Sequence, residues 1–358
     1  MHLVARAAQT GSVRPAVDLD VLGLQPMVRH GSFTNDETPF RGVRALPNGT
    51  VLTCRTDGTM RAKHGTIPKP EPAPRRAQEA RERVAPLAEA LLGAAQPLAR
   101  HGEPVRLALS GGRDSRLMAA VLYGAGVPLY ARTYGFADDP DVLLATRIAQ
   151  ALGIEHRVQL TAAEQPDAVT VGHPLTRAHH IIRICEGMNS AYERVNGYAP
   201  YVMEPRTSGS GGETLRGGFL YGQDDVSPDG LQKRVRLIFR AGEKYLTAAA
   251  NERARALHEA WIEKISADGF DVLDKLYLFY RTGRWIVGSH TATLMNSPYY
   301  HPFFDNRVVR ETLTLPGRVA TQRGGHFPAH RDARSATARH PPGGQTLAVR
   351  AYPSLAAN

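Results

Sequence analysis

The pattern of apolar positions is clearest in the middle of the chain, where short apolar runs alternate with amphipathic segments. The runs have the length of buried strands, and the segments between them carry apolar residues at helical spacing. In chain order these runs and segments are residues 105–109, 115–123, 129–134, 140–152 and 156–160. Gly124 and Gly153 follow the two amphipathic segments, as glycine often does where a helix ends. The alternation predicts an α/β fold with a parallel sheet, right-handed crossovers and helices on both faces.

The amino-terminal part has a different pattern. Residues 1–65 consist of short apolar pieces that are broken by turn signals. Within them, Thr50–Cys54 is followed by Asp57-Gly58 and then Met60, which predicts a β-hairpin. We therefore expect a small β-rich region at the amino terminus.

A linker and a helical segment follow this region. Residues 66–74 contain four prolines, which favour an extended linker. Residues 77–100 are rich in Ala, Leu, Glu and Arg and have helical spacing. Pro86 and Pro97 lie inside this segment, so we expect two helical pieces or a kinked helix.

Beyond the alternating region the pattern is helical. Candidate helices cover residues 232–241, 245–267 and 272–287. The last forty residues are poor in apolar residues and have no usable periodicity. We therefore expect four parts, which are the β-rich region over 1–65, the linker and helix over 66–100, the main domain over 101–316 and a basic tail over 317–358.

Composition narrows the class of protein. The chain has 358 residues, 42% hydrophobic and 22% charged, and can bury a core without disulfides. Its two cysteines exclude a disulfide scaffold and a zinc site built from cysteines. No apolar run has the length of a membrane span, and the first residues lack the apolar stretch of a secretion signal. We expect a cytoplasmic protein with no membrane partner.

The charge balance is basic, with 44 Lys and Arg against 34 Asp and Glu and a net charge of +10. Clustered positive charge is typical of nucleic-acid binding and equally of enzymes that handle polyanionic nucleotides. Much of the excess lies in the tail after Pro316, where aromatic residues do not alternate with arginines as they do in base-stacking surfaces. This composition disfavours a nucleic-acid partner.

A glycine-rich turn joins the first predicted strand to the helix after it. Its sequence is Leu-Ser-Gly-Gly-Arg-Asp-Ser over residues 109–115, which places two hydroxyls and unpaired N–H groups at a helix amino terminus, where anions bind. Asp114 would repel a phosphate unless a cation lay between them, and Mg²⁺ prefers carboxylate and phosphate oxygens. The same residues also fit an ordinary helix cap. The Walker A and G-x-G-x-x-G patterns are absent.

This turn resembles the pyrophosphate-binding loop (PP-loop) of the ATP pyrophosphatases, which cleave ATP between the α and β phosphates and adenylate a substrate oxygen. A second segment, Arg-Thr-Ser-Gly-Ser-Gly-Gly-Glu-Thr-Leu-Arg-Gly-Gly over 206–218, is similar to the Ser-Gly-Glu-Gly-x-Asp-Glu-x-x-x-Gly-Gly segment of asparagine synthetases. Related β-lactam synthetases and lasso-peptide macrolactam synthetases resemble it too. Residues 38–49, 133–156 and 302–305 are similar to further parts of the same family.

The resemblance implies an adenine nucleotide α-hydrolase-like PP-loop fold in the main domain, with ATP and Mg²⁺ as cofactors. It implies that Asp114 and Glu213 bind the metal. It also implies that ATP and its pyrophosphate are bound by Leu109, Ser110, Gly111, Gly112, Asp114, Ser115, Tyr134, Gly135, Ser208 and Gly209.

The amino terminus departs from the family's pattern. Family glutaminase domains use an amino-terminal cysteine as nucleophile, whereas residue 2 here is His2, and residues 1–65 are too few for that whole domain. Cys54 lies in the predicted hairpin, where it fits a small apolar residue better than a nucleophile. We therefore interpret residues 1–65 as a remnant of such a domain and expect the amine to come from a source other than glutamine.

The residue that would assist the amine also differs. Ser210 stands where asparagine synthetases have a glutamate that helps the amine lose its proton, and a serine hydroxyl has no useful basicity near neutral pH. Glu186, His179 and His180 are nearby in sequence and are alternative bases.

The carboxyl-terminal part lacks a further family feature, a lysine that stabilises acyl transfer. No lysine follows Lys275 in this chain. Arg323, Arg331 or Arg334 would replace its charge, because arginine suits phosphate, although it does not reproduce every role of lysine.

These observations favour an ATP-dependent carbon–nitrogen ligase that adenylates a carboxylate, releases AMP and pyrophosphate, and forms an amide, with ring closure in natural-product biosynthesis as one option. Its catalytic residues would be Asp114, Ser210 and Arg323. The substrates would be small-molecule or peptide carboxylates and amines, and a homodimer or a biosynthetic partner protein is compatible with this role. A catalytically impaired nucleotide-binding scaffold is the main alternative, and a tRNA-modifying relative is a weaker one.

Overall fold

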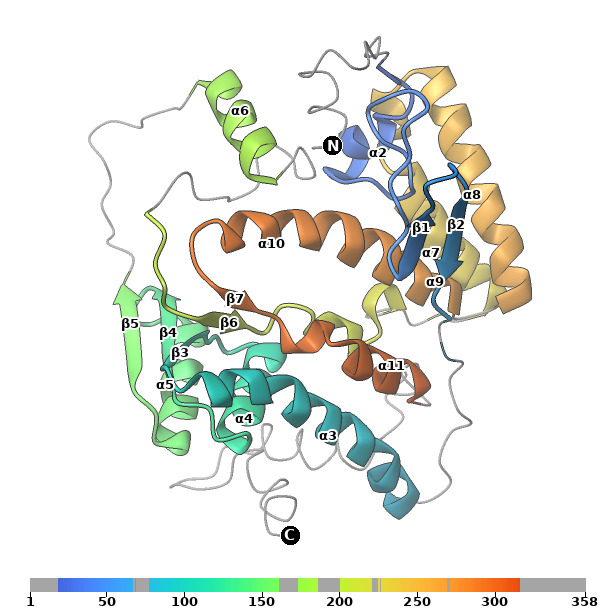
Figure 1. Cartoon of the computed structure of the whole chain (residues 1–358). Helices are drawn as coiled ribbons and strands as arrows, with labels where there is room; N and C mark the ends of the chain where they lie inside the picture. The colour runs from blue at the N-terminus through green and yellow to red at the C-terminus, as the bar shows by residue number, and fades with distance from the viewer. Residues whose placement is uncertain are drawn as a thin grey trace. The chain divides into compact units, whose positions relative to one another are not determined.

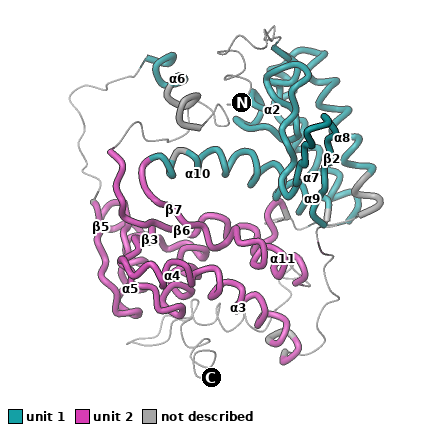
Figure 2. The backbone as a smooth tube through the Cα atoms, viewed as in Figure 1, with its two compact units in different colours: residues 1–66, 170–199, 225–295 teal, residues 67–169, 200–224, 296–358 magenta. Residues whose placement is uncertain are grey.

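The fold is described from a computed structural model that places residues 19–66, 68, 77–160, 173–185, 200–220, 225, 227–268 and 271–315. The chain divides into two compact units, which Figure 2 colours separately. Unit 1 consists of residues 1–66, 170–199 and 225–295, and unit 2 of residues 67–169, 200–224 and 296–358. Arg323 and the rest of the predicted tail lie outside the described residues.

Unit 2 contains a five-stranded parallel sheet (Figure 1). Its strands follow the order β5-β4-β3-β6-β7 across the sheet. Their bounds are β3 Val105–Ala108, β4 Leu129–Gly135, β5 His156–Leu160, β6 Arg206–Ser208 and β7 Tyr299–Tyr300. The predicted α/β fold with a parallel sheet is therefore confirmed, and the three strands with apolar runs lie within a residue of their predicted bounds.

Four helices of unit 2 form its core with one face of this sheet. They are α3 (Ala77–His101), α4 (Arg113–Gly124), α5 (Pro140–Leu152) and α11 (Asn306–Thr314). Leu107 of β3 and Ala131 of β4 point into this core and are fully buried, together with Met118 of α4. Helix α5 has the predicted bounds because Pro140 suits a first turn and Gly153 ends the helix in the left-handed conformation, with a φ of 64°.

The expectation of two separate helical pieces after the linker is wrong, whereas a kink in this helix stays a prediction. Helix α3 runs through Pro86 and Pro97 as one element. Both prolines lie on its exposed side, whereas Leu91 and Leu98 on the other side are buried in the core. Burial of that apolar face compensates for the two backbone hydrogen bonds that the prolines remove.

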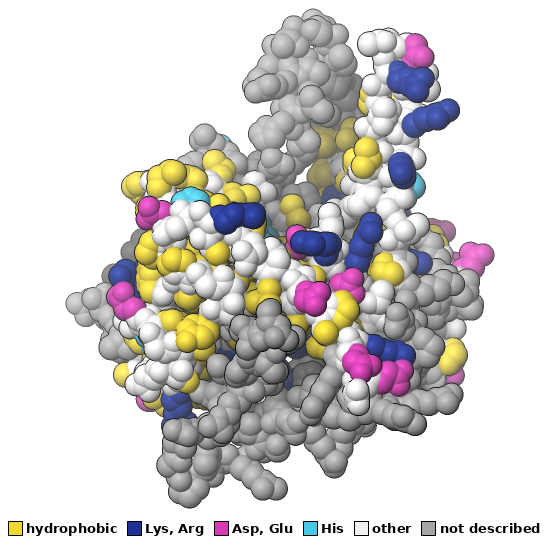
Figure 3. Space-filling view, turned by 60° about the horizontal axis from the view of Figure 1, so that its bottom comes forward, with side chains coloured by type: hydrophobic (Ala, Val, Ile, Leu, Met, Phe, Trp, Pro, Cys, Tyr) yellow, Lys and Arg dark blue, Asp and Glu magenta, His cyan; other side chains and the backbone are white. Residues whose placement is uncertain are grey.

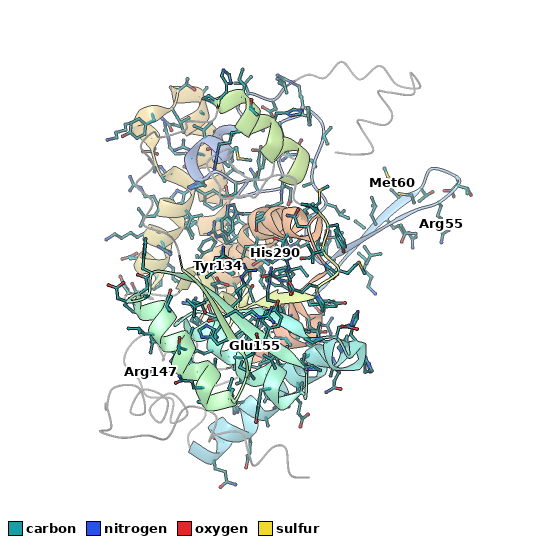
Figure 4. All side chains as sticks on the ribbon, turned by 90° about the vertical axis from the view of Figure 1, so that its left-hand side faces the viewer. Arg55, Met60, Tyr134, Arg147, Glu155 and His290 are labelled. Carbon is teal, nitrogen blue, oxygen red and sulfur yellow. The ribbon has the colours of Figure 1, made fainter. Side chains whose placement is uncertain are left out.

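Unit 1 contains the hairpin and most of the remaining helices. The predicted hairpin is confirmed as β1 (Thr50–Cys54) and β2 (Met60–His64), which pair in antiparallel register. The hairpin is exposed, and Figure 4 shows Arg55 and Met60 at its free end. Two short helices of this unit are α2 (Gln25–His30) and α6 (Pro174–Cys185).

The predicted helical character after residue 225 is confirmed in unit 1. Its helices there are α7 (Pro228–Arg240), α8 (Ala248–Asp268), α9 (Asp271–Leu276) and α10 (Val287–Leu294). A π-helical stretch, Tyr277–Ile286, joins α9 to α10. Arg284 in this stretch is buried and donates hydrogen bonds to the backbone carbonyls of Asn35 and Glu37.

The surface that Figure 3 shows carries Lys and Arg side chains interspersed with Asp and Glu rather than gathered in one continuous patch. None of the described helices is both long enough and apolar enough to cross a membrane.

Candidate functional site

A cavity of about 460 Å³ opens at the carboxyl ends of β3, β4 and β6. Strand β3 is flanked by β4 on one side and by β6 on the other, so the winding of the sheet changes direction here, and open α/β sheets bind ligands in such crevices. The volume is typical of small-molecule sites. The lining residues are Ala108, Leu109, Ser110, Asp114, Ser115, Arg132, Thr133, Tyr134, Asp141, Ser208, Gly209, Ser210 and Glu213.

The glycine-rich turn connects β3 to α4 and is held in shape by its own serines. The hydroxyl of Ser115 accepts a hydrogen bond from the backbone N–H of Ser110 at 3.2 Å. The backbone N–H of Gly112 donates to the Ser110 hydroxyl at 3.1 Å. The two hydroxyl oxygens lie 3.1 Å apart. The turn therefore keeps a fixed shape, with the first residues of α4 facing the cavity.

Asp141 in the first turn of α5 contacts the same turn. Its Oδ1 accepts a hydrogen bond from the backbone N–H of Gly111 at 2.9 Å. A Cβ at position 111 would lie 2.7 Å from this oxygen, so glycine is needed for the close approach. The backbone N–H of Gly111 is therefore already hydrogen-bonded to a carboxylate of the protein.

The second glycine-rich segment packs directly on the first. A Cβ at position 209 would lie 2.4 Å from the backbone nitrogen of Ser115, and a Cβ at position 212 would lie 2.6 Å from the Cβ of Asp114. No larger side chain fits either position without moving backbone, since real Cβ contacts are not this short. The two motifs, about a hundred residues apart in sequence, thus form two walls of one cavity.

Both predicted metal-binding carboxylates line this cavity. Asp114 forms a two-point ion pair with Arg216, with Nε to Oδ1 at 3.0 Å and Nη2 to Oδ2 at 2.7 Å. Glu213 accepts a hydrogen bond from the backbone N–H of Gly211 at 3.0 Å. Three carboxylates and one arginine line the cavity, so a polyphosphate would need added cations to bind there. Two carboxylates suit Mg²⁺, which takes its remaining ligands from phosphate and water.

Residues of β4 form a third wall of the cavity. The Thr133 hydroxyl donates to the backbone carbonyl of Leu109 at 2.8 Å, and its oxygen lies 2.8 Å from Nε2 of His156. Burial lowers the pKa of His156, which favours the neutral ring. The Arg132 guanidinium lies over the ring of Tyr134, which is 58% exposed and offers an aromatic surface at the mouth of the cavity.

Most of the residues that sequence predicts for the site lie together here. Nine of them line the cavity, namely Leu109, Ser110, Asp114, Ser115, Tyr134, Ser208, Gly209, Ser210 and Glu213. Gly111 and Gly112 lie in the turn without lining the cavity. Gly135 also does not line it, and a Cβ there would lie 2.6 Å from Oδ2 of Asp139, which is a packing reason for glycine. Arg323 lies outside the described residues.

Four lining residues are absent from the sequence-based prediction. They are Ala108, Arg132, Thr133 and Asp141. Two of them could have been predicted from their positions. Arg132 lies two residues before Tyr134 on a predicted strand and therefore shares its face. Asp141 follows Pro140 in the first turn of a predicted helix. The alternative bases His179 and His180 lie on α6, in unit 1, and Glu186 lies outside the described residues.

A parallel sheet with this turn, the second glycine-rich segment and two carboxylates at its carboxyl edge has the features of an ATP-utilising synthetase domain. The family model for asparagine synthase matches residues 87–277, which is more than half of the chain. The chain therefore belongs to the asparagine synthase family, whose members are ATP-utilising amide-forming ligases.

One solved structure that the chain matches is the NH3-dependent NAD synthetase from Campylobacter jejuni subsp. jejuni NCTC 11168 in complex with the nitrate ion. It is 14% identical over 57% of this chain and 94% of that chain, with a TM-score of 0.27. A comparison with curated proteins finds no match.

Proposed function

We propose that the protein is an ATP-dependent synthetase that adenylates a carboxylate, releases pyrophosphate and passes the acyl group to an amine, leaving AMP. The observation that carries this proposal is the meeting of the PP-loop turn with the Ser208–Glu213 segment in one cavity. Family membership supports the use of ATP, and the two carboxylates in the cavity support the use of Mg²⁺.

The chain's own groups have distinct parts in this reaction. The pyrophosphate would be bound by the backbone N–H groups of the first turn of α4 and by the hydroxyls of Ser110 and Ser115, because the three N–H groups before α4 already donate within the protein. Tyr134 would lie against the adenine. Asp114 and Glu213 would hold Mg²⁺, which when bound neutralises the charge that develops on departing pyrophosphate. Ser210 would lie beside the reacting carboxylate, and a proton acceptor for the amine must come from another group.

The attacking amine would belong to a second substrate, to free ammonia or to the acyl donor itself. An intramolecular amine would close a ring, and proximity would then replace much of the entropy that two separate reactants lose.

One observation favours the second candidate function, a nucleotide-binding scaffold. Arg216 occupies both oxygens of Asp114, the carboxylate that metal would need. A chain in which this pair never opened would bind nucleotide without cleaving it.

Hydroxylamine trapping separates the two functions. The protein is incubated with ATP, Mg²⁺ and hydroxylamine together with a panel of amino acids and peptide carboxylates, and hydroxamate and AMP are measured. The proposal predicts hydroxamate and AMP in equal amounts, and D114N abolishes both. Glu89 is exposed on α3, so E89Q is the matched control and keeps the activity. Nucleotide binding with no AMP over the whole panel would favour the scaffold.

A further inference from the structure

Arg216 contacts a lining residue of the cavity, and the sequence analysis gives it no role. The chain turns back after Glu213, with the backbone N–H of Arg216 donating to the Glu213 carbonyl at 3.1 Å. This turn directs the guanidinium onto Asp114, and both carboxylate oxygens accept from it. The close packing of Gly212 against Asp114 fixes the start of this turn.

The ion pair conflicts with metal binding at Asp114. A carboxylate needs a free oxygen to ligate Mg²⁺, and a guanidinium beside that oxygen repels the ion. The same carboxylate therefore has two cationic partners that exclude each other. Asp114 can bind Mg²⁺ only after Arg216 has moved away from it.

The charges around the cavity indicate where Arg216 would go. The lining contains Asp114, Asp141 and Glu213 against Arg132, so a polyphosphate meets a surplus of negative charge. The guanidinium on Asp114 lies next to this lining and is planar, which suits two-point contact with phosphate oxygens. The Arg216 side chain is 29% exposed and that of Asp114 is 19% exposed, so solvent and ions reach both members of the pair. The pair can therefore be exchanged.

We propose that Arg216 is a phosphate-binding residue that changes partner: it pairs with Asp114 in the empty cavity and with the nucleotide's phosphates once Mg²⁺ takes the carboxylate. The metal then enters with the nucleotide rather than before it. The inference rests on the proposed function, because it takes a nucleoside triphosphate as the ligand. Arg216 and the metal compete for Asp114, so removal of the guanidinium strengthens metal binding and weakens nucleotide binding.

Two measurements on the full chain test the exchange. Binding of Mn²⁺ without nucleotide is followed by electron paramagnetic resonance, and binding of α,β-methylene-ATP in saturating Mg²⁺ is followed by calorimetry. R216Q should bind Mn²⁺ about tenfold more tightly than the wild type and the nucleotide analogue about tenfold more weakly. The gain in Mn²⁺ affinity should disappear in the R216Q/D114N double variant, which places it at Asp114.

Arg147 provides the matched control. It is exposed on α5 and lies apart from Tyr134 (Figure 4), so R147Q removes the same charge from unit 2 and should change neither affinity. R216K keeps a positive charge without the two-point geometry and should fall between R216Q and the wild type in both measurements. It also serves as the test variant if R216Q does not fold.

The outcomes separate this inference from the proposed function. Equal Mn²⁺ affinity in the wild type and R216Q, with nucleotide binding intact in Mg²⁺, would overturn the exchange and leave the proposed function standing. A wild type that binds Mn²⁺ but no nucleotide under any condition would overturn the proposed function, and the phosphate-binding role of Arg216 with it.

Discussion

Gly209 allows a direct test of how the two glycine-rich motifs pack. A Cβ at this position would lie 2.4 Å from the backbone nitrogen of Ser115, 2.7 Å from the carbonyl carbon of Asp114 and 2.8 Å from the Cα of Ser115. All three atoms belong to the backbone at the start of α4, so no side-chain rotation relieves the contact. G209A must therefore separate the second segment from the PP-loop turn.

The expected destabilisation follows from overpacking. Added methyl groups in packed regions cost about 1–3 kcal/mol, and G209A belongs at the upper end because backbone must move. A loss of about 3 kcal/mol corresponds to a melting temperature lower by about 6–12 °C for a unit of this size. Affinity for α,β-methylene-ATP should fall with it, since the displaced segment forms a wall of the cavity.

Two other glycines calibrate this measurement. G111A brings a Cβ to 2.7 Å from a side-chain oxygen of Asp141 and 2.8 Å from a methyl of Leu144, both of which can shift, so its effect should be smaller. G124A meets its nearest atom at 3.4 Å at the end of α4 and should be neutral or stabilise by up to about 1 kcal/mol. Calorimetric melting with and without the analogue gives both quantities. A G209A protein that melts within about 2 °C of the wild type and keeps its affinity would refute the packing argument.

Three further predictions concern stability. L98A removes a fully buried side chain of α3 and should lower the free energy of unfolding by about 2–5 kcal/mol in urea titrations; a loss below about 1 kcal/mol would contradict the assigned core. R284M leaves the backbone carbonyls of Asn35 and Glu37 without their buried donor and should cost about 1–3 kcal/mol, whereas an unchanged urea midpoint would show that these bonds are dispensable. Burial, with nearby Arg29, lowers the pKa of His30 to about 4, so the unfolded chain takes up a proton at higher pH than the folded one. The wild type should therefore lose about 2–3 kcal/mol as pH falls from 6.5 to 4, and H30Q should reduce that slope; equal slopes would contradict a buried neutral ring.

Much of the fold can be predicted because its local signals agree with its tertiary structure. Helix α5 has both a proline at its start and a glycine in the left-handed region after its end, so local chemistry determines its bounds. The expectation of two helical pieces at α3 is wrong because the prolines lie on its exposed side, and burial of the opposite face outweighs local propensity. Strands β6 and β7 have only three and two residues, so their apolar pattern is too short to predict a strand.

Some parts of the candidate site can likewise be predicted from local sequence, whereas others depend on tertiary contacts. The two glycine-rich segments are recognisable from a few consecutive residues. They contain Asp114 and Glu213, so the sequence predicts that both carboxylates belong to the site, and both line the cavity. The pair between Asp114 and Arg216 joins residues 102 apart and has no local signal. The contact of Asp141 with Gly111 likewise depends on how α5 packs beside the turn.

A crystal structure of the full chain grown with α,β-methylene-ATP and Mn²⁺ tests the central claim most directly, because the anomalous signal of Mn²⁺ locates the metal independently of the nucleotide. The predicted result is a metal about 2.2 Å from carboxylate oxygens of Asp114 and Glu213, with the terminal phosphates on the Ser110–Ser115 turn. Nucleotide bound away from the carboxyl ends of β3, β4 and β6, or metal with neither carboxylate as a ligand, would contradict it.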